Sequence, residues 1–339
     1  MLCMAAARLG YTTLVLDPDP TAPAAQVAGR HVVAPYDDPT GLDALAACAA
    51  VTYEFENVPA SVAERLAART RLVPPPNALA VSQDRLEEKR AVAALGLPVA
   101  AHRAVDGPND LIAARGTLGA IVLKTRRLGY DGKGQAVIGA DMPGEEAERV
   151  RRDLGGTGLI AERLLPLDAE CSVIVVRGAD GALVTFDPAR NVHEDGILRR
   201  STVPSGLGDG IEDEARSVAR TIAEGLGYVG AMGVELFVVP DGLVVNEIAP
   251  RVHNSGHWTE AACPIDQFEA HVRAVAGLPL GDGSRHSDAE MGNLLGDETH
   301  DIGALLADPR VRVHLYGKAE ARPGRKMGHW TRIAPRSDA

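Results

Sequence analysis

The stretch Leu123-Lys-Thr-Arg-Arg-Leu-Gly-Tyr-Asp-Gly-Lys-Gly-Gln135 decides the fold of this chain. The apolar run Gly119–Leu123 predicts a buried strand with Lys124 at its end, and Ala136–Ile138 predicts a second strand. The glycines between them lack a Cβ atom, so their backbone N–H groups can turn toward an anion. We interpret the segment as a lid over phosphates. A basic surface hairpin with a flexible tip is the alternative interpretation.

The composition narrows the class of protein before any site is considered. The chain has 339 residues and a net charge of −11, which disfavours nucleic acid as a partner. Its four cysteines are scattered without a Cys-x-x-Cys pair, as is typical of a reduced cytoplasmic protein. No apolar run is long enough to span a membrane. Neither of the two common glycine-rich phosphate motifs is present.

The first part of the chain alternates predicted strands and helices, which favours an α/β fold with a doubly wound parallel sheet. Val51–Phe55 is expected as one strand of this sheet. A helix is expected over Ser61–Thr70, with Ser61 as N-cap and Glu64 completing a capping box. After a proline run, Asn77–Leu95 is expected as one long helix. A larger middle part and a short, mixed last part follow.

Two glutamates, Glu235 and Glu247, form the clearest candidate metal site. Pro240-Asp-Gly242 suits a three-residue hairpin loop, which would pair Val239 with Leu243 and therefore Glu235 with Glu247. Carboxylates opposite each other repel unless a cation joins them, and oxygen ligands suit Mg²⁺. A two-residue loop would instead place the glutamates on opposite faces of the sheet. The alternative interpretation is a solvated acidic face.

The segment Arg251-Val-His-Asn-Ser-Gly-His257 follows the glutamate pair. His253 and His257 have a zinc-like spacing, but Ser255-Gly256 interrupts a helix and no glutamate follows the first histidine. We therefore interpret this segment as an anion-binding loop in which Arg251 provides the charge.

Several motifs resemble those of the 5-(carboxyamino)imidazole ribonucleotide synthase family of ATP-grasp enzymes, over nearly the whole chain. They are Thr52-Tyr-Glu-Phe-Glu-Asn-Val-Pro59, Gln83-Asp-Arg-Leu-Glu-Glu-Lys89, Gly129-Tyr-Asp-Gly-Lys-Gly-Gln135, His193-Glu-Asp-Gly-Ile-Leu-Arg199, Asn246-Glu-Ile-Ala-Pro-Arg-Val-His-Asn-Ser-Gly-His-Trp258 and Tyr316-Gly-Lys318. The resemblance implies an ATP-grasp fold in three parts. These are a pre-ATP-grasp α/β domain over residues 1–85, an ATP-grasp domain over 86–278 and a small C-terminal domain over 279–339.

The resemblance also implies a reaction. ATP, bicarbonate and aminoimidazole ribonucleotide would give the carboxyamino ribonucleotide, ADP and phosphate through carboxyphosphate, in purine biosynthesis. The implied cofactors are ATP and Mg²⁺, with Mn²⁺ as the alternative metal, and the implied assembly is a homodimer. Another ATP-grasp carboxylate–amine ligase and a non-catalytic nucleotide-binding protein are the alternative functions.

The resemblance assigns roles to individual residues. Glu235 and Glu247 match the metal ligands, and Tyr130, Asp131, Lys318 and Arg325 match the ribonucleotide site. Asp131, Lys318 and Arg251 are the candidate catalytic residues. The nucleotide positions are Arg85, Lys124, Gly129, Tyr130, Asp131, Gly132, Lys133, Gly134, Gln135, Glu162, Arg163, Leu164, Leu165, Glu170, His193, Asn246 and Glu247.

The chain departs from the family pattern in two places. Ala249 stands where many ATP-grasp enzymes have a metal-binding asparagine. The strand and glycine-rich loop that open the family's first domain would precede Met1 and are missing here. That loop is expected to bind the ribonucleotide phosphate at a helix N-terminus, so its loss predicts weak ribonucleotide binding or poor solubility.

The assignment of Asp131 gives a direct prediction. Asp131→Ala should leave ATP binding intact but abolish carboxylation of the amine, because no carboxylate would accept the amine proton. Calorimetry measures the first property and ADP-coupled turnover the second. Unchanged turnover would refute the role.

Overall fold

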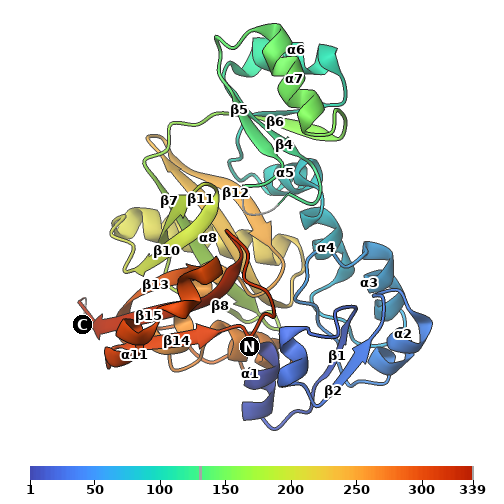
Figure 1. Cartoon of the computed structure of the whole chain (residues 1–339), viewed down its shortest axis with the longest axis vertical. Helices are drawn as coiled ribbons and strands as arrows, with labels where there is room; N and C mark the ends of the chain where they lie inside the picture. The colour runs from blue at the N-terminus through green and yellow to red at the C-terminus, as the bar shows by residue number, and fades with distance from the viewer. Residues whose placement is uncertain (130–131, 338–339) are drawn as a thin grey trace.

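The architecture is taken from a computed structural model, which describes residues 1–129 and 132–337. Its sheets are a two-stranded, a four-stranded and a nine-stranded one. In Figure 1 the four-stranded sheet and its helices form a small lobe at the top, above the large sheet and the N-terminal part. No helix among the described residues is long and apolar enough to cross a membrane.

The N-terminal part contains the parallel pair β1 and β2, as the alternating pattern predicts. The expected strand Val51–Phe55 is wrong, because only Val51 pairs in parallel, with Leu72. The next residue, Thr52, instead bonds by its hydroxyl to His271, 2.8 Å away. The elements here are α1 (Leu2–Arg8), β1 (Leu14–Asp17), η1 (Pro23–Gln26), β2 (Arg30–Val33), α2 (Pro39–Ala46) and α3 (Ala60–Ala67).

The capping box predicted for α3 is not formed. The helix begins at Ala60, so Pro59 is its N-cap and Ser61 lies inside the first turn. The Pro59 carbonyl accepts the N–H of Val62 at 2.8 Å, which starts the helix without a side-chain cap. Helical hydrogen bonding therefore begins earlier than the Ser-x-x-Glu pattern indicates.

The long helix expected over Asn77–Leu95 is two helices, α4 (Pro76–Ser82) and α5 (Arg85–Ala94). Asp84 breaks the run, because its backbone is extended and its carboxylate accepts the N–H of Leu86 as the N-cap of α5. The same carboxylate binds the Arg126 guanidinium through two hydrogen bonds of 2.7 and 2.9 Å. These bonds hold the start of α5 against the segment that leads into the glycine loop.

The upper lobe confirms the predicted strand, loop and strand. Its sheet has the order β3-β6-β4-β5, and β4 pairs with β5 with Ile121 opposite Ile138. Both residues are fully buried in the core of the lobe. The elements are β3 (His102–Val105), α6 (Pro108–Leu118), β4 (Ile121–Thr125), β5 (Gln135–Ile138), α7 (Gly144–Asp153) and β6 (Leu159–Arg163).

The large sheet has the order β12-β11-β7-β9-β10-β13-β15-β14, with β8 paired to β7. The C-terminal strands β13 to β15 thus continue the same sheet as the middle part of the chain. One face packs against α8 and the other against α10 and α1, in two separate cores. Its strands are β7 (Ala169–Arg177), β8 (Leu183–Thr185), β9 (Ala189–Glu194), β10 (Ile197–Val203), β11 (Gly230–Val239), β12 (Gly242–Ala249), β13 (Ser287–Leu295), β14 (Val311–Leu315) and β15 (Lys326–Pro335).

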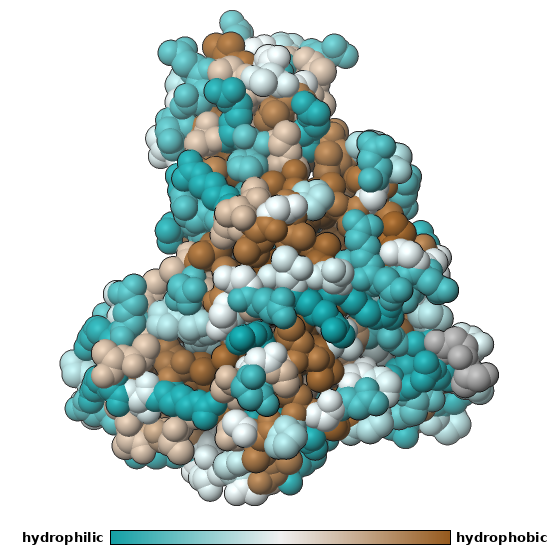
Figure 2. Space-filling model, turned by 180° about the vertical axis from the view of Figure 1, so that it is seen from behind, coloured by the Kyte–Doolittle hydropathy of each residue, from teal (hydrophilic) through white to brown (hydrophobic). Residues whose placement is uncertain are grey.

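The remaining helices are short apart from α8. They are α8 (Asp209–Gly225), η2 (Asn254–Gly256), α9 (Thr259–Ala262), α10 (Gln267–Ala276), η3 (Gly296–His300) and α11 (Gly303–Ala307). Figure 2 shows the molecule from behind, where apolar residues gather in the middle of the face, below the lobe.

Asp84 provides a stability prediction. Asp84→Ala should lower the free energy of unfolding by about 2 kcal/mol, because the helix loses its N-cap and Arg126 loses its carboxylate partner. Urea unfolding followed by circular dichroism measures this change. The matched control is Asp43→Ala, whose ion pair with Arg69 at 2.7 Å is exposed. It should cost at most about 0.5 kcal/mol. Equal losses in the two variants would contradict the prediction.

Candidate active site

A cavity of about 1550 Å³ lies where the lobe, the large sheet and the N-terminal part meet. Its lining includes most of the side chains that the sequence singles out. These are Arg85, Lys124, Gly129, Gly132, Gln135, Glu170, His193, Glu235, Asn246, Glu247, Arg251 and Lys318.

The floor of the cavity is one face of the large sheet. Glu235 on β11 is directly opposite Ser172 on β7, and Glu170 is opposite Asn191 on β9. Because side chains alternate along a strand, Glu170 and Ser172 share one face while Cys171 and Val173 lie in the core beneath α8. The strands therefore present polar groups to the cavity and apolar groups to α8.

The hairpin between β11 and β12 differs from the predicted one. Its loop is Pro240 and Asp241 alone, since Val239 already pairs with Gly242 and Val238 with Leu243. The three-residue loop is therefore wrong. Gly242, with φ of +126°, belongs to the strand rather than to the loop.

Glu235 and Glu247 are nevertheless opposite each other, because a bulge restores the register. Leu236 pairs with Val245, but the next partners are Glu235 and Glu247, so Asn246 is an extra residue in β12. The two-residue loop shifts the register by one position and the bulge shifts it back. The predicted pairing of the two carboxylates is thus confirmed, by a different mechanism.

Helix α5 clamps this bulge. Lys89 donates its ammonium group to the carbonyls of Val245 and Asn246 at 3.1 and 2.6 Å. Glu88 accepts the N–H of Ile248 at 2.7 Å. Both side chains are buried, and sequence reasoning assigned them no role. Their position in the Gln83–Lys89 motif was the available signal.

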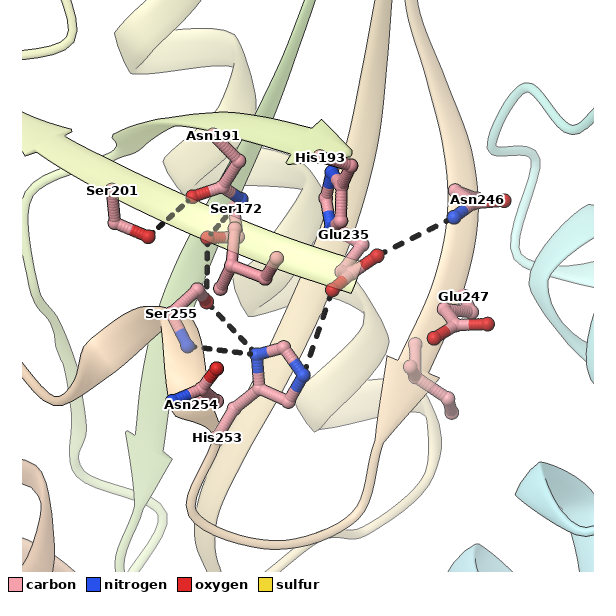
Figure 3. A network of polar contacts seen from close by, with 12 residues as sticks. Ser172, Asn191, His193, Ser201, Glu235, Asn246, Glu247, His253, Asn254 and Ser255 are labelled. Carbon is pink, nitrogen blue, oxygen red and sulfur yellow. Dashed lines mark hydrogen bonds and ion pairs between the residues drawn. The ribbon is translucent and has the colours of Figure 1, made fainter. Parts of the chain in front are cut away.

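Arg85, one turn earlier on α5, binds the Glu247 carboxylate at 2.7 Å. Burial alone would raise the pKa of Glu247, but this guanidinium lowers it to about 2. For Glu235, burial and the neighbouring Glu247 raise the pKa to about 7. Its own contacts are the Asn246 amide at 3.4 Å and His253 at 3.5 Å (Figure 3).

This charge pattern fits a divalent cation. Arg85 compensates Glu247, whereas the nearest contacts of the partly buried Glu235 are the Asn246 amide and the His253 imidazole. No group of three or more His, Cys, Asp or Glu side chains suited to a metal occurs among residues 1–129 and 132–337. Mg²⁺ does not need such a group, because it retains waters and takes the remaining ligands from substrate phosphates.

Lys124, at the end of β4, reaches the cavity beside these carboxylates. Its ammonium group binds Glu162 at 2.9 Å, and Lys89 is 3.7 Å from the same carboxylate oxygen. The two lysines hold the pKa of Glu162 below its ordinary value despite burial, which acts in the opposite direction. Glu162 therefore interacts with both lysines, Lys89 of the clamp and Lys124 in the cavity.

The segment expected to present backbone groups to adenine is Glu162–Leu165, on and after β6. The N–H groups of Arg163 and Leu164 bond to the carbonyls of Ala101 and Ala120, at 2.8 and 3.0 Å. None of Glu162, Arg163, Leu164 or Leu165 is among the described residues that line the cavity.

The glycine loop lies over the cavity from the lobe side. A Cβ atom on Gly132 would be 2.7 Å from the Asp195 carbonyl, so this glycine rests against the turn between β9 and β10. Gly134, at φ of +75°, would similarly meet Thr125 at 2.6 Å. Arg85 also reaches the loop, with 3.5 Å to the Gly129 carbonyl. Lys133 lies between these glycines, whereas Tyr130 and Asp131 are outside the described residues.

Glu170 and His193 are in contact through the imidazole Nδ1 atom. Burial lowers the pKa of His193, but the bond to Glu170 and the charges of Glu235 and Glu170 together outweigh burial and raise the pKa. The two residues that the family resemblance assigns to the nucleotide thus form one acid–base pair on the cavity floor.

Two further predicted residues come from the last part of the chain. Lys318 lines the cavity, 5.4 Å from the ring centroid of Tyr316, and donates to the Lys326 carbonyl at 2.7 Å. Arg325 is not among the described lining residues, and its guanidinium donates to the Glu320 carbonyl at 2.9 Å.

Arg251 crosses to the N-terminal part and binds Glu56 at 2.9 Å. Glu56 belongs to the Thr52–Pro59 motif, but it was not singled out individually from the sequence. This ion pair ties the segment after β12 to the wall of the cavity.

The fold and the site together define an ATP-grasp enzyme. The chain matches the family model of the ATP-grasp domain over residues 90–268 and that of the ribonucleotide synthetase preATP-grasp domain over 1–83. The model of the phosphoribosylaminoimidazole carboxylase C-terminal domain matches residues 289–339.

Individual relatives agree with this assignment. The N5-carboxyaminoimidazole ribonucleotide synthase of Brucella melitensis is 51% identical, over 99% of this chain and 94% of the relative. The crystal structure of the synthetase from Thermus thermophilus is 42% identical, with a TM-score of 0.91, over 98% of this chain and 90% of that one. An Aspergillus clavatus structure in complex with ADP and 5-aminoimidazole ribonucleotide is 30% identical, with a TM-score of 0.91, over 100% and 91% of the two chains.

The chain belongs to the N5-carboxyaminoimidazole ribonucleotide synthase family and is an ATP-dependent ligase. The family and the ATP-grasp fold predicted from the motifs are confirmed.

The clamp on the bulge can be tested through Lys89. Lys89→Met should reduce kcat/KM for ATP by about a hundredfold, or ~2.7 kcal/mol, because the bulge carbonyls lose their donor and the glutamate pair loses its register. Steady-state ADP release measures this effect. The neighbouring exposed Arg90→Met is the matched control and should retain full activity. Equal activity of both variants would contradict the role of the clamp.

Proposed function

We propose that this site carboxylates 5-aminoimidazole ribonucleotide with bicarbonate, using ATP and giving the N5-carboxyamino product, ADP and phosphate. The observation that carries the proposal is the directly opposed pair of Glu235 and Glu247, with Arg85 beside it, in one cavity with Lys124 and Lys318. Cationic side chains around a carboxylate pair suit phosphoryl transfer, because they stabilise the negative charge of the phosphate oxygens.

The ATP phosphates would lie between the glycine loop and the carboxylate pair. Lys124 and Arg85 then supply positive charge from the lobe and from α5. Glu235 and Glu247 would hold Mg²⁺, which neutralises phosphate oxygens when it is bound. Glu170 and His193 would bind the sugar, and Asn246 would complete the nucleotide side. Under this proposal the adenine would occupy the region near Glu162–Leu165.

The chemistry has two steps. A bicarbonate oxygen attacks the γ-phosphorus of ATP, the bond to the bridging oxygen breaks, and ADP leaves with carboxyphosphate formed. The amine then gains the carboxyl group, directly or as released CO₂, and inorganic phosphate leaves. Arg251 would hold the bicarbonate or carboxyphosphate anion, and Asp131 would accept the amine proton. Lys318 and Arg325 would bind the ribonucleotide phosphate, with Tyr130 contributing from the loop.

The second candidate function is another carboxylate–amine ligation on the same fold, and the third is nucleotide binding without catalysis. Another carboxylate–amine ligation would require a different carboxylate substrate, such as formate. Nucleotide binding without catalysis is disfavoured, because binding alone does not require two opposed carboxylates placed by a bulge. We also propose that the enzyme acts as a homodimer in the cytoplasm, which light scattering and cell fractionation would test.

The reaction is tested by coupled ADP release. We expect release only when ATP, Mg²⁺, bicarbonate and aminoimidazole ribonucleotide are all present, with formate unable to replace bicarbonate. Glu235→Gln should lower kcat at least a hundredfold, since it removes a metal ligand. Glu224→Gln, exposed on α8, is the matched control and should remain active. A rate of ADP release that does not depend on the ribonucleotide would refute the proposed reaction.

A further inference from the structure

A chain of buried polar side chains crosses the large sheet and ends at Glu235 (Figure 3). Ser201 on β10 bonds to Asn191 on β9 at 2.8 Å, and Asn191 bonds to Ser172 on β7 at 2.9 Å. Ser172 bonds to Ser255 at 2.7 Å, and Ser255 to Nδ1 of His253 at 2.8 Å. The other imidazole nitrogen, Nε2, is 3.5 Å from the Glu235 carboxylate.

The stability of the fold alone does not explain this chain of polar side chains, because its surroundings are apolar. The side chains of Ser172, Asn191, Ser201 and Ser255 are all buried, with at most 4% of each residue exposed. Farther along β7 the same face carries Ile174 and Val176, which pack in the apolar core. Buried hydroxyl and amide groups add little stability over apolar ones even when their hydrogen bonds are made. Where the chain ends is therefore its most informative property.

The hydrogen bonds at His253 fix which nitrogen carries the proton. The backbone N–H of Ser255 can only donate, and it is 3.4 Å from Nδ1. The same contact caps the short helix η2 with the His253 side chain. Nδ1 therefore accepts, and the imidazole proton of the neutral ring is on Nε2. The Ser255 hydroxyl, at 2.8 Å, is closer to Nδ1 than this backbone N–H, so the hydroxyl is the main donor that holds the tautomer.

The rest of the chain is consistent with this direction. The Asn191 amide nitrogen donates to Ser172, so the Ser172 hydroxyl hydrogen is available for Ser255. The Ser255 hydroxyl can then donate to Nδ1 of His253. Each group donates toward the histidine, and the first hydrogen bond of the series is the one from the Ser201 hydroxyl to the Asn191 oxygen.

The far end of the chain acts on the carboxylate. The Nε2–H group of His253 faces one Glu235 oxygen, and the Asn246 amide faces the other at 3.4 Å. The two donors restrict rotation of the carboxylate about its Cγ–Cδ bond. In Figure 3 the Glu235 carboxylate lies between His253 and Asn246, and Glu235 and Glu247 both line the cavity.

We propose that Ser201, Asn191, Ser172 and Ser255 form a positioning relay that fixes His253 as the Nε2–H tautomer, so that His253 orients the Glu235 carboxylate. His253 is thus a positioning residue for the metal-binding carboxylate pair. The value of this orientation for catalysis rests on the proposed function, but the tautomer and its dependence on the relay do not. Polar contacts around a metal ligand commonly set its orientation.

The relay is tested by nuclear magnetic resonance on the full chain labelled with ¹⁵N-histidine, without substrates. Long-range ¹H–¹⁵N spectra distinguish protonated from unprotonated imidazole nitrogens, and the signal missing in His253→Gln assigns the ring. We expect the wild type to show a protonated Nε2 and an unprotonated Nδ1. Ser255→Ala and Ser172→Ala should shift the His253 nitrogens toward a mixture of tautomers and lower kcat about tenfold. The KM for ATP should change less than kcat.

The matched control is Ser205→Ala, which removes another buried serine hydroxyl. The Ser205 hydroxyl donates to Glu212 at 2.6 Å and is not part of the relay. It should leave both the His253 spectrum and turnover unchanged. A wild-type ring protonated on Nδ1 would overturn the proposal even if every variant failed to fold. So would an unaltered tautomer in both relay variants. An Nε2–H ring that responds to the relay, in a chain without carboxylation activity, would support the relay and contradict only the proposed reaction.

Discussion

The site depends on one electrostatic constraint, which is that two partly buried carboxylates must lie opposite each other on a sheet without separating the strands. A two-residue hairpin loop cannot provide this arrangement, because it places Glu235 and Glu247 out of register. The extra residue Asn246 corrects the register, and the Lys89 ammonium group bonds to the carbonyls that the bulge displaces. The bonds from Lys89 on helix α5 thereby hold the hairpin in this register against the repulsion between the carboxylates.

Helix α5 therefore connects the lobe to the large sheet. Its N-cap, Asp84, binds Arg126 after β4, and the backbone N–H of Arg85 bonds to the Arg126 carbonyl at 2.9 Å. The side chain of Arg85 binds Glu247 on the large sheet, and Lys89 approaches Glu162 on β6. The lobe that carries the glycine loop is thus tied to the carboxylate pair through one helix of ten residues.

Much of this could be predicted from the sequence, because strand alternation and motif spacing are local properties. The strands around the glycine loop and the pairing of Glu235 with Glu247 are examples. The bulge could not be predicted, since it depends on Lys89, far away in the sequence, bonding to two carbonyls. The break at Asp84 has the same origin in a tertiary contact with Arg126. The buried relay is only weakly indicated in the sequence, by single polar residues such as Ser172 and Asn191 within strands.

The continuous large sheet has a mechanical consequence. Strand β13 is bonded directly to β10, so the part of the chain that carries Lys318 shares an unbroken hydrogen-bonded ladder with Glu235. A hinge between these two regions would have to shear that ladder. Among the described residues the sheet of the lobe is separate from the large sheet. Apart from the isolated bridge between Val99 and Val245, the lobe is held by side-chain contacts and by helix α5. Glu235 and the strands that flank Lys318 therefore belong to one continuous sheet, and a movement of the lobe relative to them would take place between the two sheets.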